Sequence, residues 1–169
     1  MAKFNPPQGE YLLNVDGKYY NTLDISGFSQ MMKDPSYCYK FYWLEAIVNI
    51  ISEGTQDTTF NAIIDEMICN AWYSVREFHI HLSGLQADGF VRDGLERAVL
   101  KLTDISSLPS NASKMEIKNA IYGYDLELKT YKEQLTNMVP GRALAGFFSH
   151  GTIKGRFLVI FPGQFRPDG

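Results

Sequence analysis

The stretch that decides the fold runs from residue 37 to residue 78 and has the sequence YCYKFYWLEAIVNIISEGTQDTTFNAIIDEMICNAWYSVREF. It contains two apolar segments with helical periodicity, separated by the polar break EGTQDTT. Apolar side chains that recur every three to four residues lie on one face of a helix. The stretch therefore predicts two consecutive helices in a mainly α domain.

The first of these helices is predicted over residues 36–52, with Gly54 just beyond its end. Its main apolar row consists of Phe41, Leu44, Val48 and Ile51, and further apolar residues occupy its other faces. A helix that is apolar on nearly all sides is expected at the centre of a core. Glu45 lies inside this helix, and a buried carboxylate needs a hydrogen-bond donor. We expect it to anchor an arginine such as Arg76, with a functional acid as the alternative.

The second helix begins after a threonine-rich segment, with Asp57, Thr58 or Thr59 as its N-cap. Its apolar stripe is broad and follows helical spacing throughout. The stripe consists of Phe60, Ile63, Ile64, Met67, Ile68, Ala71, Trp72 and Val75. This helix is therefore predicted to contribute a large share of the core.

Three more helices are predicted after residue 90. One spans about residues 91–106, and the next opens with a capping box between Ser113 and Glu116 and ends at Gly123. The last begins at Asp125 and stops at Pro140, because proline has no backbone N–H to continue a helix.

The two ends of the chain differ from this helical part. Asp16-Gly17 lies between short runs of β-forming residues, which predicts a hairpin over residues 10–25. Residues 141–169 are rich in glycine and lack helical periodicity. The predicted fold is mainly α, with about five helices, a small N-terminal β-hairpin and an irregular C-terminal tail. The predicted boundaries are 1–35 for the hairpin and turn, 36–140 for the helical core and 141–169 for the tail.

Composition narrows the classes of function. The net charge of −3 leaves no basic footprint of the kind that proteins use to neutralise many phosphates. The N-terminal MAKFNPPQGEY has no apolar core of a signal peptide, and the longest apolar run is too short to span a bilayer. These features predict a soluble, cytoplasmic protein without a membrane partner. Cys38 and Cys69 lie inside apolar helical patterns and are expected to be free thiols rather than a disulfide.

The pair His79 and His81 is a weak candidate for a metal site. A zinc site needs three or four ligands, and neither cysteine stands at a recognisable spacing from this pair. Two solvated imidazoles at a helix end are the expected interpretation, so no metal site is assigned.

Three segments resemble known proteins: YCYKFYWLEAIVNIISEG at 37–54, IIDEMICNAWYSVREFHIHL at 63–82 and LTNMVPGRALAGFF at 135–148. They resemble the N-terminal helical region of bacterial HNH endonuclease-like proteins, over about residues 35–148. One departure is Gly141, where the family pattern has an aromatic residue between Pro and Arg. In the family a nuclease module follows this region, and no such module occurs in these 169 residues.

The resemblance implies an accessory domain that positions DNA or binds a partner and is not catalytic by itself. No catalytic residue is assigned, because none of His79, His81 and His150 is followed by the asparagine and second histidine of an HNH module. No cofactor is expected within this chain, and a divalent metal would belong only to the missing nuclease module. The candidate partner is duplex DNA, and the weak candidates for contacting it are Lys40, Asn61, Asn70 and Arg76.

The alternative is a homo-oligomeric protein-interaction module without a nucleic-acid role. An acidic helical domain rich in tyrosine can dimerise or dock another protein, because tyrosine combines contact area with a polar tip. Salt-dependent binding to duplex DNA would favour the first function, and self-association without it would favour the second. A stand-alone enzyme would need a pocket that contains a strongly perturbed carboxylate.

Overall fold

The computed structural model describes residues 25–32, 38–55, 57–83 and 89–144. Within these residues the secondary structure is helical, which confirms the mainly α prediction. The helices are α1 (Ile25–Met32), α2 (Tyr39–Ser52), α3 (Phe60–Arg76), α4 (Gly94–Ile105), α5 (Lys114–Gly123) and α6 (Asp125–Ala143). Residues 10–24 of the predicted hairpin and most of the tail lie outside the described residues, and Ile25 is the first residue of α1. Helix α1 falls in a stretch for which the sequence pattern gave no helix.

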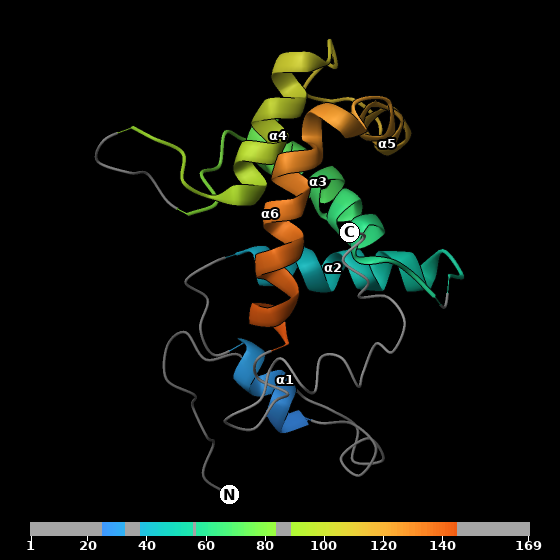
Figure 1. The fold of residues 1–169 in the computed structure, drawn as a ribbon, viewed down its shortest axis with the longest axis vertical. Helices are drawn as coiled ribbons and strands as arrows, with labels where there is room; N and C mark the ends of the chain where they lie inside the picture. The colour runs from blue at the N-terminus through green and yellow to red at the C-terminus, as the bar shows by residue number, and fades with distance from the viewer. Residues whose placement is uncertain (1–24, 33–37, 56, 84–88, 145–169) are drawn as a thin grey trace, which may run out of the picture.

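Helix α3 lies at the centre of the fold and contacts α2, α4, α5 and α6 (Figure 1). Its predicted stripe is confirmed, since Ile64, Met67, Ile68, Ala71 and Trp72 are fully buried. The Trp72 indole N–H donates to the Ser110 carbonyl at 2.9 Å, so this large side chain buries its apolar rings without losing a hydrogen bond. Burial on this scale is the main stabilising contribution in a domain of this size.

The starts of α3, α4 and α5 follow from their capping residues. Thr59 caps α3 by accepting a hydrogen bond from the Ala62 N–H at 3.2 Å. Asp93 caps α4 by accepting from both Leu95 and Glu96 at 2.9 Å. Ser113 and Glu116 form the predicted capping box at the start of α5. Each cap satisfies backbone donors that have no partner inside the helix.

Helix α6 runs past Pro140, so the prediction that this proline stops the helix is wrong. Pro140 lies in the last turn, where its missing N–H removes a single hydrogen bond. Its carbonyl still accepts from the Leu144 N–H at 3.0 Å, and the residue is buried together with Val139 and Ala143. Packing of the last turn therefore outweighs the lost bond. The predicted tail begins inside the helix, at residue 141.

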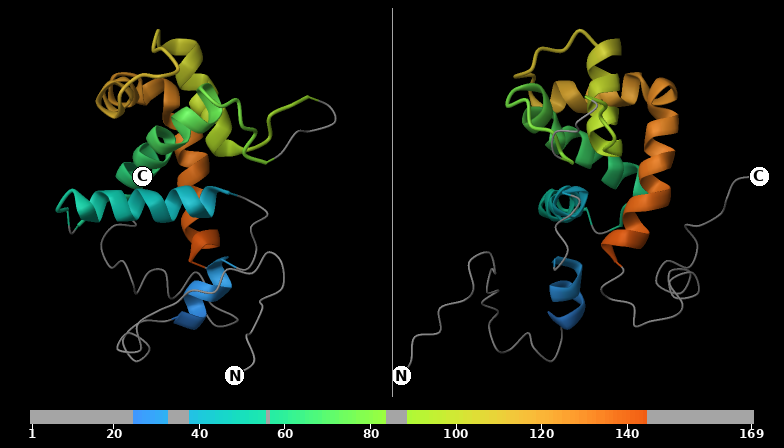
Figure 2. Two further views of the ribbon diagram at one scale, coloured as in Figure 1. Left: turned by 180° about the vertical axis from the view of Figure 1, so that it is seen from behind. Right: turned by 90° about the vertical axis from the view of Figure 1, so that its left-hand side faces the viewer.

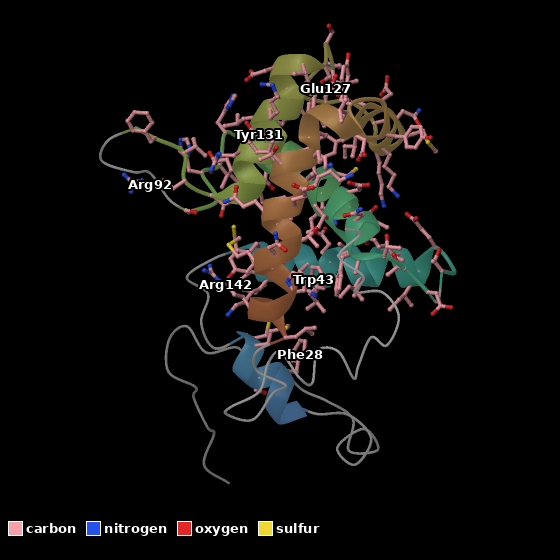
Figure 3. All side chains as sticks on the ribbon, viewed as in Figure 1. Phe28, Trp43, Arg92, Glu127, Tyr131 and Arg142 are labelled. Carbon is pink, nitrogen blue, oxygen red and sulfur yellow. The ribbon has the colours of Figure 1, made fainter. Side chains whose placement is uncertain are left out.

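Helix α2 is not the centre of the core, which corrects a second prediction. The residues that it buries are Tyr39, Trp43 and Ala46, whereas Phe41, Val48 and Ile51 are exposed. Figure 2 shows that α6 extends past α2, and Figure 3 shows Trp43 where α2 and α6 cross. The row that spacing assigned to the core thus points outward. The opposite face packs inward because it carries tryptophan and alanine, which fit against the neighbouring helices.

Candidate functional site

The four candidate DNA contacts are distributed over α2 and α3. Lys40 lies at the start of α2, where its ammonium donates to the Met31 carbonyl of α1 at 3.3 Å. Asn61 is exposed in the first turn of α3, and Arg76 is the last residue of that helix. Fifteen positions along a helix correspond to about 22 Å, so Asn61 and Arg76 lie at opposite ends.

Asn70 and Arg76 are occupied by contacts within the fold. The Asn70 side-chain oxygen accepts from the Asn49 amide at 3.3 Å, and both residues are partly buried. The Arg76 guanidinium lies over the Trp72 ring at 5.7 Å from its centre. Base readout needs side chains directed outward, and the role of these two residues as DNA contacts stays a prediction.

The two histidines do not form a metal centre. His79 is exposed and has a φ of 52°, which lets the chain turn away from the end of α3. The His81 Nδ1 atom lies 2.8 Å from Glu96 Oε1, and Glu96 also accepts from the Leu82 N–H. Among the described residues, no three His, Cys, Asp or Glu side chains gather as a metal site would require.

Glu45 does not anchor Arg76. Glu45 is exposed on the outward side of α2, so its carboxylate is solvated by water and needs no donor from the protein. The carboxylate that is buried in this hairpin is Glu66 of α3, which is only 2% exposed. Sequence reasoning missed Glu66, although a signal was present: it follows Ile63 by three residues and precedes Met67, inside the apolar stripe.

Glu66 is held by three donors from two other helices. Lys114 and Lys118, one turn apart on α5, approach Glu66 at 2.6 and 2.8 Å, and the Asn49 amide of α2 donates at 3.2 Å. The same two lysines also contact Glu53 just after α2, at 2.9 and 3.5 Å. Two carboxylates and two ammonium groups thus balance one another, and they tie α2, α3 and α5 together.

The pKa of Glu66 reflects two opposing causes. Burial by itself raises the pKa of a carboxyl group, but the hydrogen bonds from Lys114, Lys118 and Asn49 outweigh it and lower the pKa. Burial of Lys114 is likewise outweighed by its bonds to Glu66 and Glu53, so the pKa of Lys114 is raised. Both groups therefore stay charged near neutral pH, where neither exchanges a proton readily. A general acid or base needs the opposite tuning, with a pKa near the working pH.

A hollow of about 290 Å³ opens beside this cluster. The charged residues that line it are Glu53, Asp65, Glu66 and Lys118, and its apolar lining includes Ile50 and Ile121. On this lining Glu53 and Glu66 are paired with Lys118, whereas Asp65 is paired with Lys132, which lies outside the lining.

A second polar cluster joins α3 to α6. Lys132 is buried, and its ammonium lies 2.7 Å from Asp65 and also bonds Asp125. Burial raises the pKa of Asp65, and the ion pair with Lys132 only partly offsets this effect. Asp65 and Glu66 are adjacent in sequence, so one turn of α3 is bound to both α5 and α6.

Cys38 and Cys69 are free thiols, as predicted. Burial raises the pKa of each to about 11, and nearby carboxylates add to the effect. A thiol with such a pKa is almost wholly protonated at neutral pH and is a poor nucleophile.

The outward face of α2 carries large apolar side chains that do not pack into the core. Phe41, Val48 and Ile51 are 42%, 55% and 63% exposed, and Leu44 lies half-buried between them. Together these four residues form one stripe along the helix, which we name the α2 stripe. A contiguous apolar stripe on a helix surface is typical of a surface that binds another protein.

Comparison of the chain with models of protein families, with curated proteins and with solved structures finds no match. The resemblance to HNH endonuclease-like proteins therefore stays a prediction. No helix in the described ranges is long and apolar enough to cross a membrane.

Proposed function

We propose that this chain is a non-catalytic helical docking domain that binds a protein partner through the α2 stripe. This is the partner-binding form of the accessory role that the resemblance to HNH nuclease-like proteins implies. The observation that carries the proposal is the exposure of three large apolar side chains in one row on α2.

Burial of these side chains is the thermodynamic argument for docking. Each square ångström of apolar surface removed from water contributes about 25 cal/mol. A helix face of this kind is recognised by a second helix that packs its own apolar row against it. The polar cluster on the other side of α2 keeps the helix in place, so little conformational entropy is lost on binding.

The distribution of cations disfavours the DNA-positioning form of the role. Lys114 and Lys118 are neutralised by Glu53 and Glu66, and Lys132 is neutralised by Asp65 and Asp125. Binding of duplex DNA depends on cations that replace its counterions. Cations that already have carboxylate partners in the fold contribute little to such binding.

The test measures two properties of the same protein: binding of an apolar probe to the α2 stripe, and binding of duplex DNA. A fluorescent apolar probe is titrated into the chain at low protein concentration, with Val48→Asp and Leu126→Asp as variants. Leu126 is a matched control, since it is an 80% exposed apolar residue on another helix. We expect Val48→Asp to lower probe binding several-fold and Leu126→Asp to leave it unchanged.

Equal probe binding by all three proteins would contradict a docking role for α2. The same proteins are then mixed with duplex DNA at low and at physiological salt. Binding that weakens steeply as salt rises would replace the proposal with the DNA-positioning role.

A further inference from the structure

The spacing of the α2 stripe is that of a coiled-coil seam. Phe41, Leu44, Val48 and Ile51 are separated by three, four and three residues. This is the a–d–a–d pattern of two heptads, which lines up on one side of a helix when two helices pack side by side. The residues that α2 buries, Tyr39, Trp43 and Ala46, fall at the c and f positions on the opposite side. Helix α2 therefore packs into its own domain with one face and presents a seam with the other.

The charges on either side of the seam are of opposite sign. With Phe41 at an a position, Lys40 falls at g and Glu45 at e. In a parallel pair of helices, each g residue lies beside the e residue of the following heptad on the partner helix, five positions later in sequence. Lys40 and Glu45 are five positions apart, so two parallel copies of α2 would form two reciprocal ion pairs.

An antiparallel pair of α2 helices lacks this match. There, g residues meet g residues and e residues meet e residues. Lys40 would lie beside Lys40 or Ile47 of the other helix, and Glu45 beside Glu45 or Ser52, so the two charges would not meet. The Lys40 ammonium carries three N–H donors, so an ion pair across the seam is compatible with its bond to the Met31 carbonyl.

We propose that the partner of the α2 stripe is a second copy of this chain, with the two α2 helices parallel about a twofold axis. This inference rests on the docking role proposed above for α2. A second copy is favoured over a different protein because α2 itself supplies the apolar row and both signs of charge that the opposing helix needs. Such self-complementarity is the requirement of a twofold interface. The contact extends over one helix of 14 residues, so it is smaller than a standard interface and the dimer is weak.

Sedimentation equilibrium over a wide range of protein concentration tests the dimer. The wild-type chain is expected to shift from monomer to dimer as concentration rises. Val48→Asp is expected to weaken association at least tenfold by placing a charge in the seam, and Leu126→Asp is expected to leave it unchanged. A monomer at every concentration would overturn the inference, and so would a dimer that Val48→Asp does not weaken.

A charge swap tests the partner and the orientation. Lys40→Glu and Glu45→Lys each place like charges across a parallel seam, so each is expected to weaken association about three- to tenfold. The double variant Lys40→Glu, Glu45→Lys restores opposite charges and is expected to recover most of the wild-type affinity. Loss without recovery in the double variant would overturn the parallel arrangement.

Cross-linking supplies a second measure of orientation. In a parallel seam the two Val48 positions face each other, so Val48→Cys is expected to form an interchain disulfide on mild oxidation. Leu126→Cys controls for random collision, and the native Cys38 and Cys69 react slowly because burial raises their pKa to about 11. Equal cross-linking at positions 48 and 126 would contradict the assignment.

The probe titration separates failure of this inference from failure of the docking role. A chain that stays monomeric, but whose α2 stripe binds the probe, retains the docking role and excludes the second copy as its partner. A chain that neither binds the probe nor associates loses both.

Discussion

Glu45 of α2 and Glu66 of α3 are both carboxylates in the hairpin that these two helices form, yet their surroundings give them different roles. Glu45 is exposed on the outward side of α2, whereas Glu66 is buried and bonded to Lys114, Lys118 and Asn49. The residue type is the same, so the difference lies in which helix covers each position. A buried carboxylate with this many donors is a structural element of the fold.

Glu66→Gln tests that role. The amide keeps the size of the side chain but leaves Lys114 and Lys118 without their buried partner. We expect the free energy of unfolding to fall by about 1–3 kcal/mol, below the value for a fully buried pair because both lysines are partly exposed. Urea unfolding measures the change. Glu45→Gln is the matched control and is expected to stay within about 0.5 kcal/mol of wild type.

The pKa of Glu66 gives the same variant a pH dependence. The pKa is lower in the folded state than in the unfolded chain, where it is near 4.5, so the folded state binds fewer protons. The contribution of Glu66 to stability is therefore complete above about pH 4.5 and is lost as the pH falls through the folded pKa. We expect the difference between wild type and Glu66→Gln to be large at about pH 7 and to shrink toward about pH 3. A difference that stays constant over this range would show that the ionised carboxylate is not the cause.

At the scale of elements, helix α6 has one side that is buried in the core and another that is exposed. Leu128 and Leu135 are fully buried, and Lys132 lies between them with its ammonium paired to Asp65 and Asp125. Tyr131 lies where α4 and α6 meet (Figure 3). The Arg97 guanidinium of α4 lies over its ring, 5.6 Å from the ring centre. One long helix therefore combines a core stripe with a polar edge.

Leu135→Ala tests the inner face of α6. Loss of a fully buried leucine removes its transfer free energy and leaves a cavity, so we expect destabilisation by about 2–5 kcal/mol. Thermal and urea unfolding measure it. Leu126→Ala changes the same residue type on the same helix at an exposed position, and its effect is expected to stay below about 0.5 kcal/mol. Similar effects of the two substitutions would contradict the assigned faces.

Helix α5, which carries the two lysines that contact Glu66, begins with a capping box. Ser113 accepts from the Glu116 N–H, and the Glu116 carboxylate accepts from the Ser113 N–H at 2.8 Å. We expect Ser113→Ala to lower the free energy of unfolding by about 1 kcal/mol, as measured by urea unfolding. Ser107→Ala, at an exposed position between α4 and α5, is expected to be neutral.

At the scale of the whole molecule, adjacent residues of α3 connect the other helices. Glu66 connects α3 to α5 and Asp65 connects it to α6, while Asn49 brings α2 into the Glu66 cluster. These polar contacts surround a core of fully buried aliphatic and aromatic side chains. The ion pairs add little to the free energy of unfolding beyond what the core contributes. Removal of one partner is nevertheless destabilising, because it leaves a buried charge without a compensating charge.

Much of this arrangement was predictable from local patterns. The structure confirms the apolar stripe of α3, the Thr59 cap and the Ser113–Glu116 capping box. Each of these features depends only on residues that are close together in sequence. The extent of α6 beyond Pro140 was not predictable, because it depends on packing around the last turn. Nor could the ion-pair partners of Glu66 be predicted, because Lys114 and Lys118 are about 50 residues away from it in sequence.

Sequence by itself determined that this chain is mainly helical, where most of its helices begin and that its two cysteines are free. The physical reason is that periodicity and capping act over one or two turns of the chain. Tertiary structure alone decided which side of α2 faces the core, because an all-round apolar helix fits either way until its neighbours are in place. It also decided which carboxylates are buried, because burial depends on helices that are distant in sequence. The outward α2 stripe follows from those choices, and with it the proposed docking surface.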